Sequence, residues 1–360
     1  VPDVSGEWRI AIRVVDTATV RVDGEVAVAV ERAQHGGSFY GFGSDEVFGT
    51  AHLTAGRPVE LEIDYPIGGG GGMRGFVVGG RPAAEPDLLD DAVRLAAIAD
   101  VAVVVVGTND EWETEGEDRA SMSLPGRQDE LVHAVVAANP NTVVVVNTGS
   151  PVSMPWLDAV PAVLQLWFPG GQLGEALTDV LVGDVEPRGR LPITFPKSLA
   201  DTPAAPYHPG DGVTAEYGEG LLIGHRWYDA QGIEPLFPFG HGLGYTTFDV
   251  EPGCVEGSAE SGAVVRCSVQ NTGGRPGSEV VQVYVRYAGD HHDVPSLLRF
   301  VASRKVDLVP GERAELEIEL GTRAFASWLD GTWTVPPGTF HVLVGTSARS
   351  TREAGRLHAG

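Results

Sequence analysis

The amino-acid sequence predicts a multidomain protein in which an α/β domain lies between two all-β domains. At 360 residues, the chain is longer than one ordinary hydrophobic core would require, so two or three domains are expected. Its two ends show short stretches of hydrophobic alternation separated by turns, whereas its middle alternates strand and helix patterns. These changes of pattern divide the sequence into residues 1–80, 81–246 and 247–360.

The first segment has the pattern of a β-domain. Apolar and polar residues alternate in three stretches: 8–14, 18–30 and 59–65. A turn at Asp23 and Gly24 divides the second stretch into two strands. Two glycine-rich loops complete the segment, and the first of them, 35–49, also carries aromatic residues. We therefore expect strands and loops throughout residues 1–80.

The middle segment has the pattern of an α/β sandwich with a mostly parallel sheet. Asp87 can cap a helix whose apolar residues recur on one side: Leu89, Ala92, Val93, Ala96 and Ala97. Further helices are expected at 128–138 and 173–181. Three apolar runs are expected to form strands: 101–106, 142–146 and 162–167. The β-branched run 101–106 is typical of a strand that is buried on both faces.

The last segment has the pattern of a β-sandwich, with four clear strands: 264–269, 280–285, 314–320 and 339–344. The only two cysteines, Cys254 and Cys267, flank a predicted hairpin turn at 257–262. Residues equidistant from such a turn face each other, which predicts one disulfide and an extracellular or secreted protein. Two buried free thiols are the alternative.

The formal net charge of −24 argues against nucleic acid and anionic membranes as partners. Neutral or cationic small molecules stay compatible with this charge, which also favours solubility. No apolar run reaches the ~20 residues that a membrane-spanning helix needs. We expect no cofactor and no metal, and homo-oligomers stay open.

The strongest chemical signal follows the predicted strand 101–106, because ligands of α/β sheets bind at the carboxyl ends of the strands. Residues 110–119 hold six carboxylates and one arginine. Repulsion among like charges raises the pKa of the least solvated carboxyl, as a proton-donating acid of a glycosidase requires. A solvated acidic loop and a calcium site are the alternatives, although calcium loops prefer alternating Asp and Asn to a run of Glu around a Trp.

Several ordered blocks resemble family 3 glycoside hydrolases of the β-glucosidase type: 107–119 followed by 124–128, then 167–172, 183–196, 217–220, 224–229 and 237–248. The first block resembles the family's acid/base loop, in which an acidic residue precedes Gly, an aromatic residue and Asp-Arg. This register implies that Glu115 is the acid/base, with Glu113 and Glu111 as fallback candidates. The family usually has an aromatic residue where this chain has Glu117.

The flanking segments agree with this resemblance. Residues 1–80 resemble the second half of a PA14 domain, and residues 247–360 resemble the family's fibronectin type III-like domain. The resemblance implies hydrolysis of terminal β-linked glucose from small glucosides by a retaining, double-displacement mechanism. The nucleophile would be an aspartate in an N-terminal (β/α)8 barrel of the same protein.

We accordingly expect this chain to be the C-terminal portion of such an enzyme. Because it would lack the barrel and the first strands of its α/β sheet, we expect residues 1–360 alone to be poorly folded and inactive. The alternatives are a non-catalytic carbohydrate-binding relative and a family 3 enzyme that acts on another β-glycoside, such as a xyloside or a glycosylated natural product.

Aromatic residues are the candidate substrate contacts. Trp112 could stack on a sugar or an aglycone, and so could the loop aromatics Phe39, Tyr40, Phe42 and Phe48. Anchoring of the loops on their own core is the alternative role.

Structural roles are expected for several other polar residues. We expect an ion pair for Arg119 and satisfied structural sites for His225 and His241. For His291 and His292 with Asp290 and Asp293, we favour a solvated loop over a metal site.

Overall fold

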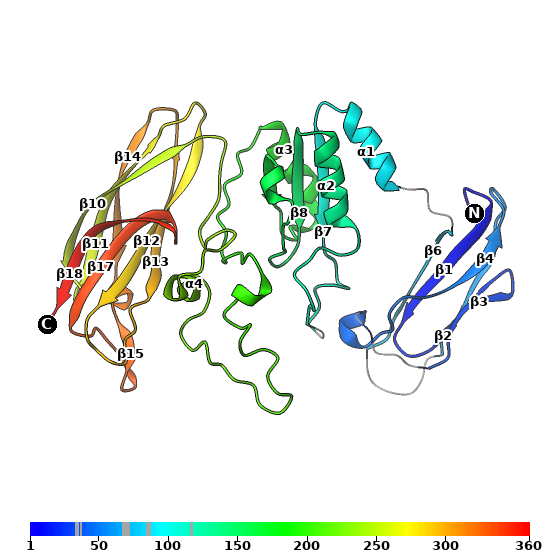
Figure 1. Ribbon diagram of the computed structural model, residues 1–360, viewed down its shortest axis with the longest axis horizontal. Helices are drawn as coiled ribbons and strands as arrows, with labels where there is room; N and C mark the ends of the chain where they lie inside the picture. Colours follow the sequence, from blue (N-terminus) through cyan, green and yellow to red (C-terminus); the bar gives the residue numbers. More distant parts are fainter. Residues whose placement is uncertain (33–35, 37, 67–72, 84–87, 116–117) are drawn as a thin grey trace. The chain divides into compact units, whose positions relative to one another are not determined.

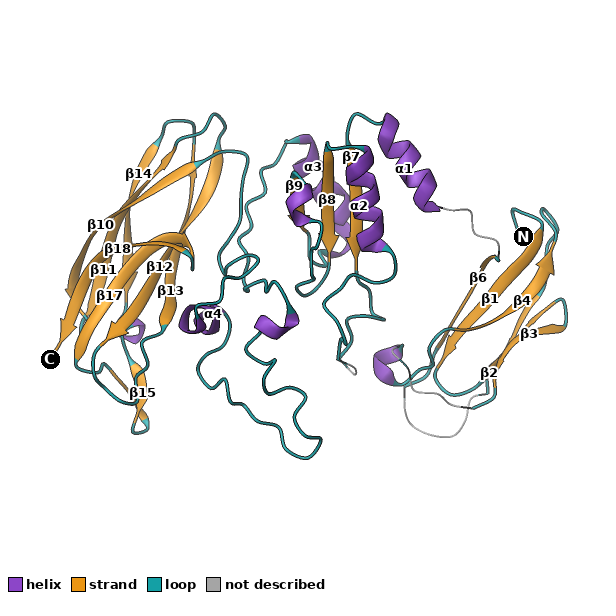
Figure 2. Cartoon of the chain, viewed as in Figure 1, coloured by secondary structure: helices purple, strands orange, loops and turns teal. Residues whose placement is uncertain are grey.

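The computed structural model describes residues 1–32, 36, 38–66, 73–83, 88–115 and 118–360. The chain divides into two compact units, Val1–Pro169 and Gly170–Gly360 (Figure 1). The first unit holds a β-rich segment and an α/β segment, and the second ends in a large antiparallel β-sandwich (Figure 2). No helix among the described residues is long and apolar enough to cross a membrane.

The first segment consists of two three-stranded antiparallel sheets that share one apolar core. The strands are β1 (Gly6–Val14), β2 (Ala18–Val22), β3 (Glu25–Val30), β4 (Val47–Leu53), β5 (Leu61–Asp64) and β6 (Phe76–Pro82). They form sheets of order β4-β1-β6 and β3-β2-β5. Alternate residues of β1 and β2, such as Ile12, Val14 and Val20, are almost completely buried between the sheets.

The hairpin of β2 and β3 confirms the turn that the sequence predicts at Asp23 and Gly24. The predicted strand 59–65 is shorter, and β4 and β6 were not expected. β4 packs closely on β3 because Gly49 has no side chain: a Cβ there would lie 1.7 Å from the Ala27 carbonyl oxygen.

The α/β segment contains a parallel sheet of order β7-β8-β9. Its elements are α1 (Leu88–Ile98), β7 (Ala102–Gly107), α2 (Gln128–Ala138), β8 (Thr142–Asn147) and β9 (Ala162–Gln165). The predicted helix 128–138 is confirmed residue for residue. The predicted cap Asp87 lies outside the described residues.

The prediction that the first strand of this sheet is buried on both faces is wrong. β8 is central, and Val144, Val145 and Val146 are fully buried. β7 is an edge strand, and its Val103 and Val105 side chains are 44% and 56% exposed. They line an apolar groove of about 310 Å³ together with residues of α1 and α2.

The second unit begins with α3 (Leu173–Val182) and α4 (His225–Gln231), joined by a long irregular segment. The start of this irregular segment is tied to the sandwich by polar side chains. Glu186 accepts hydrogen bonds from the backbone N–H groups of Ser278 (2.8 Å) and Tyr245 (3.2 Å). Arg190 forms a mostly buried ion pair with Glu279 at 2.7 Å.

The sandwich consists of sheets β10-β11-β14 and β13-β12-β17-β18. The strands are β10 (Phe248–Ser258), β11 (Gly262–Asn271), β12 (Gly277–Ala288), β13 (Leu298–Leu308), β14 (Arg313–Leu320), β17 (Gly338–Ser347) and β18 (Ser350–Ala359). A small hairpin of β15 (Ser327–Leu329) and β16 (Thr332–Thr334) lies between β14 and β17. The four strands that the sequence predicts here are confirmed.

The predicted disulfide is not formed. The hairpin of β10 and β11 exists, but Val255 pairs with Val265, and the continuation of this register puts Arg266 rather than Cys267 opposite Cys254. Beyond the register shift between Pro252 and Val255, Cys267 lies opposite Pro252. Cys254 is exposed and Cys267 is buried in the sandwich core, and both are free thiols. The expected secreted location therefore stays a prediction without this support.

Candidate active site

The loops that leave the three parallel strands meet at the carboxyl edge of the sheet. The acidic loop follows β7, residues 148–151 follow β8, and Trp167 and Phe168 follow β9. Gly107, the last residue of β7, is held by the side-chain amide of Gln128: Oε1 accepts a hydrogen bond from the Gly107 N–H at 2.6 Å, and Nε2 donates one to the Gly107 carbonyl oxygen at 2.9 Å. The acidic loop therefore starts from a fixed point.

Glu113 is the carboxylate that ties this edge together. Its Oε1 accepts hydrogen bonds from the Thr108 hydroxyl and from the Gly149 N–H, the latter at 3.1 Å. The side chain is 14% exposed, and Arg119 Nη1 lies 4.0 Å away. A Cβ at position 149 would lie 2.5 Å from Glu113 Oε2 and 2.7 Å from the Phe168 ring, so a larger residue there would displace these side chains. These contacts give Glu113 a structural role.

Arg119 extends the same network to the loop after β8. Its Nη1 donates to the Ser150 hydroxyl at 2.7 Å and to the Pro151 carbonyl at 3.3 Å. These hydrogen bonds agree with the structural role expected for Arg119, with Glu113 as its carboxylate neighbour. Three buried polar atoms at this edge have no hydrogen-bond partner among the described residues: Arg119 Nη2, Asn147 Oδ1 and Gln165 Oε1. Unpaired buried polar groups are costly, which makes them candidates for contacts with a bound molecule or another part of the protein.

Glu111 connects the acidic loop to the first segment. Its carboxylate forms an ion pair with Arg13 of β1, and the side chains are 33% and 27% exposed. Arg13 Nη2 also lies 3.6 Å from Glu46 Oε2. Glu111 therefore pairs with the first segment.

Glu115, the predicted acid/base, differs from both neighbours. It is exposed, and no described residue forms a hydrogen bond or an ion pair with its carboxylate. Gly116 and Glu117, which belong to its motif, lie outside the described residues. Of the three candidate glutamates, Glu115 alone is not committed to a described contact that fixes the loop.

The predicted stacking residues lie in different environments. Trp112 is 46% exposed and lines a pocket with Arg13 and Ser38. The Phe39 ring packs against the backbone of Gly43 and Gly75, where added Cβ atoms would lie 2.5 and 2.9 Å from it, so Phe39 anchors its loop. Phe42 is 55% exposed. The side chain of Tyr40 lies outside what the structure describes.

Phe48 is 50% exposed and stacks under a cation. The Arg9 guanidinium lies 3.4 Å from the centroid of its ring.

The two histidines of the glycine-rich blocks have structural contacts, as expected. His225 hydrogen bonds to the Leu298 carbonyl oxygen at 2.9 Å and stacks on Phe239, and His241 stacks on Phe237. Burial lowers the pKa of both imidazoles. Both rings therefore favour the neutral form, which suits packing against aromatic side chains.

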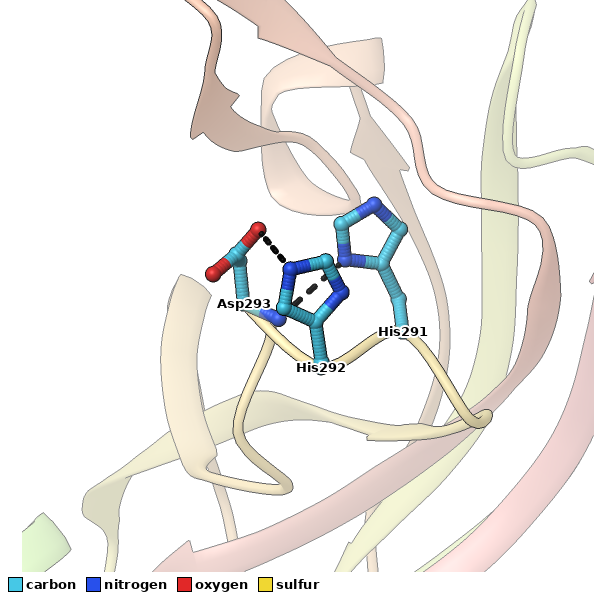
Figure 3. Close-up of side chains that lie close together, drawn as sticks. All are labelled: His291, His292 and Asp293. Atoms are coloured by element: carbon cyan, nitrogen blue, oxygen red, sulfur yellow. Dashed lines mark hydrogen bonds and ion pairs between the residues drawn. The ribbon is translucent and has the colours of Figure 1, made fainter.

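His291, His292 and Asp293 lie side by side in the loop after β12 (Figure 3). Their ligand atoms are within 4.8 Å of one another, and the two rings stack at 5.3 Å. The His292 and Asp293 side chains are 86% and 59% exposed and contact each other at 2.9 Å. The exposure agrees with the solvated loop that the sequence suggests.

The fold and this edge together define a class of protein: an α/β domain with a carboxylate-rich edge, followed by a fibronectin type III-like sandwich. Residues 4–245 match the family model of the glycosyl hydrolase family 3 C-terminal domain, and residues 279–348 match that of a fibronectin type III-like domain. The chain belongs to glycosyl hydrolase family 3.

Similar proteins extend this relationship over nearly the whole chain. A β-glucosidase of Rhizobium radiobacter is 38% identical over 374 residues, which cover 99% of this chain and 45% of the relative. The crystal structure of the Kluyveromyces marxianus β-glucosidase in complex with glucose superimposes with a TM-score of 0.91 at 35% identity, over 99% of this chain and 43% of that one. The Bifidobacterium adolescentis family 3 β-glucosidase superimposes with a TM-score of 0.71 at 37% identity, over 76% and 41%. The chain thus spans less than half the length of these relatives.

Sequence reasoning missed the residues that hold the acidic loop. Thr108, Gly149 and Ser150 were not singled out, nor was Arg13 as a partner of Glu111. The loop after β8 could have been found from topology, because the carboxyl ends of neighbouring parallel strands share one edge. Arg13 gave no such signal, since 98 residues separate it from its partner.

Proposed function

We propose that this chain is the C-terminal portion of a retaining β-glucosidase and that it supplies the acid/base, Glu115. The observation that carries the proposal is the division of roles within the acidic loop. Glu113 is committed to the sheet edge and Glu111 to Arg13, whereas Glu115 is exposed at the position that the family motif gives to the acid/base.

In the proposed reaction, the Glu115 carboxyl protonates the glycosidic oxygen as the bond to the leaving group breaks. The nucleophile, an aspartate of the N-terminal barrel, forms the glycosyl-enzyme. The Glu115 carboxylate then removes a proton from the water that hydrolyses this intermediate and returns to its starting form. The exposed position of Glu115 suits this exchange with solvent and substrate.

The exposed apolar groove beside β7 supports the proposed partnership with an N-terminal portion. Val103 and Val105 would be covered if another part of the protein packed on this face of the sheet. The unpaired polar atoms of Arg119, Asn147 and Gln165 lie at the catalytic edge, where substrate or barrel would meet them.

We further infer that residues 1–80 are the second half of a PA14-like insert. Two small antiparallel sheets with one core support this inference. So does the difference in coverage among the solved relatives, 99% for one and 76% for another, because an insert of this size would be present in only some members. The boundaries 1–80, 81–246 and 247–360 are part of the same proposal.

The test is reconstitution. The chain is produced with and without the N-terminal portion of its own protein, and hydrolysis of an aryl β-glucoside is measured. We expect activity and improved solubility only when both portions are present. Activity of residues 1–360 alone would require a nucleophile within this chain, and inactivity of the complete protein toward β-glucosides would favour a carbohydrate-binding role.

A further inference from the structure

The loop after β12 brings together three side chains that can bind a metal, in a part of the chain that the proposed reaction does not use (Figure 3). One ligand atom each from His291, His292 and Asp293 lies within 4.8 Å of the other two. In a tetrahedral zinc site, nitrogen and oxygen ligands lie roughly 3.3 Å from one another. The three side chains therefore need to approach by no more than about 1.5 Å to hold one zinc ion.

The backbone that carries these side chains is held in place by the sandwich. The His291 N–H donates to the hydroxyl of buried Tyr287 at 3.4 Å, and this hydroxyl donates to the Pro337 carbonyl oxygen at 2.7 Å. The Val294 N–H donates to the His291 carbonyl oxygen at 3.0 Å, which closes a turn around the three residues. The Val294 side chain belongs to the sandwich core. Because the turn is already formed, metal binding does not have to order the backbone.

The side chains themselves are accessible and need only a local rearrangement. His292 Nε2 lies 2.9 Å from Asp293 Oδ2, and these side chains are 86% and 59% exposed. The planes of the two imidazole rings differ by only 5°, and the Asp293 N–H donates to His291 Nδ1 at 3.3 Å. Imidazole nitrogens bind a metal in the plane of the ring, so the His292 ring has to turn, which its exposure allows.

Solvent access is compatible with a metal site. The sequence favours a solvated loop because neighbouring histidines and aspartates do not reveal whether their side chains converge, whereas the structure brings their ligand atoms together. A zinc ion with three protein ligands completes its coordination with water, which an exposed loop supplies. Asp290 precedes the three residues, and the net charge of −24 of the chain favours the approach of a cation.

We propose that His291, His292 and Asp293 bind one zinc ion, with water in the remaining coordination position. Two imidazoles and one carboxylate suit Zn²⁺, whereas Ca²⁺ and Mg²⁺ prefer oxygen ligands alone. The site belongs to the β-sandwich and goes beyond the proposed β-glucosidase function, because no step of that reaction involves these residues.

The experiment uses the complete protein without a polyhistidine tag, treated with a chelator and then dialysed to remove it. Isothermal titration calorimetry with zinc chloride at pH 7.5 gives the stoichiometry and the affinity. We expect saturable binding of one Zn²⁺ per chain at this loop, and we expect Ca²⁺ and Mg²⁺ neither to bind there nor to compete with zinc.

Matched variants locate the ion. His292→Ala and Asp293→Asn each remove one ligand and should weaken zinc binding at this site by about tenfold or more. His358→Ala removes an exposed histidine from β18 of the same sandwich and should leave zinc binding unchanged; His358 belongs to no such group of ligands among the described residues.

Three results would overturn the site. They are the absence of zinc binding to the wild type, equal stoichiometry and affinity in the wild type and His292→Ala, and an equal loss in His292→Ala and His358→Ala. Each would leave adventitious surface binding at most. Because calorimetry does not depend on catalysis, these results leave the β-glucosidase proposal untouched, and a complete protein without glucosidase activity would leave the zinc site intact.

Discussion

Replacement of Glu113 by alanine should loosen the acidic loop without removing the acid/base. The carboxylate accepts hydrogen bonds from Thr108 and Gly149, and its side chain is only 14% exposed. A hydrogen bond to a charged group contributes about 1.5–3 kcal/mol, so the loss of two, with partial replacement by water, should cost about 3 kcal/mol. Glu113→Gln keeps an acceptor oxygen and should cost about 1 kcal/mol.

Hydrogen exchange measures this loss where it occurs. If the Gly149 amide exchanges through local opening, ~3 kcal/mol corresponds to roughly 100-fold faster exchange in Glu113→Ala. The peptide that contains Gly149 reports it by mass spectrometry, and α2 (Gln128–Ala138) serves as an internal reference.

The kinetics of the same variant should be insensitive to the leaving group. A displaced loop lowers kcat/KM for phenyl and dinitrophenyl β-glucosides by similar factors, because the proton donor itself is retained. Unchanged exchange at Gly149 would refute the structural role of Glu113. A loss confined to poor leaving groups, with rescue by azide, would make Glu113 the acid/base.

Three further outcomes follow from the second unit. Glu186→Ala should lower the free energy of unfolding by about 2–4 kcal/mol, because two backbone N–H groups lose their buried acceptor, and Glu186→Gln should lower it less. Thermal unfolding compares the two variants. Equal midpoints for wild type and Glu186→Ala would contradict the structural role of Glu186. Burial lowers the pKa of His225 in the folded state, so the unfolded state binds the proton first and the free energy of unfolding should fall as the pH drops below about 6.5. His225→Gln should flatten this dependence between pH 7.5 and 5.5, whereas the exposed control His133→Gln should not. Identical slopes for wild type and both variants would refute the contribution of His225. Cys254 should react with a thiol reagent in the native protein, whereas Cys267, whose pKa burial raises to about 11, should react only after unfolding. If neither thiol reacts in the unreduced, unfolded protein, the two cysteines form a disulfide and the assignment of free thiols is wrong.

Much of the fold could be predicted because the relevant signals are local. The helix at 128–138 and the strand at 142–146 follow from hydrophobic spacing alone, and both lie where that spacing puts them. Burial depends instead on neighbours that a local pattern does not encode. The run 101–106 has the composition of a central strand but forms the edge of its sheet, and the alternate side chains Val101, Val103 and Val105, which share one face, are exposed.

Strand register and contacts between distant residues also could not be predicted from the sequence. The two cysteines flank one hairpin, but they are not equidistant from its turn, and Pro252 rather than Cys254 lies opposite Cys267. In the acidic loop, Glu111, Glu113 and Glu115 recur at every second residue, so spacing alone does not distinguish them. Their roles separate only through contacts with residues far away in the sequence, namely Gly149 and Arg13.

The role of Glu115 is tested most directly by the leaving-group dependence of Glu115→Ala in the complete protein, measured with and without azide. The variant should lose several orders of magnitude in kcat/KM for phenyl β-glucoside, which needs protonation, and much less for dinitrophenyl β-glucoside, which does not. Azide should restore turnover of the dinitrophenyl substrate by attacking the glycosyl-enzyme, with β-glucosyl azide as the product. Equal losses for both substrates without rescue, or full activity, would contradict the assignment of Glu115 as the acid/base.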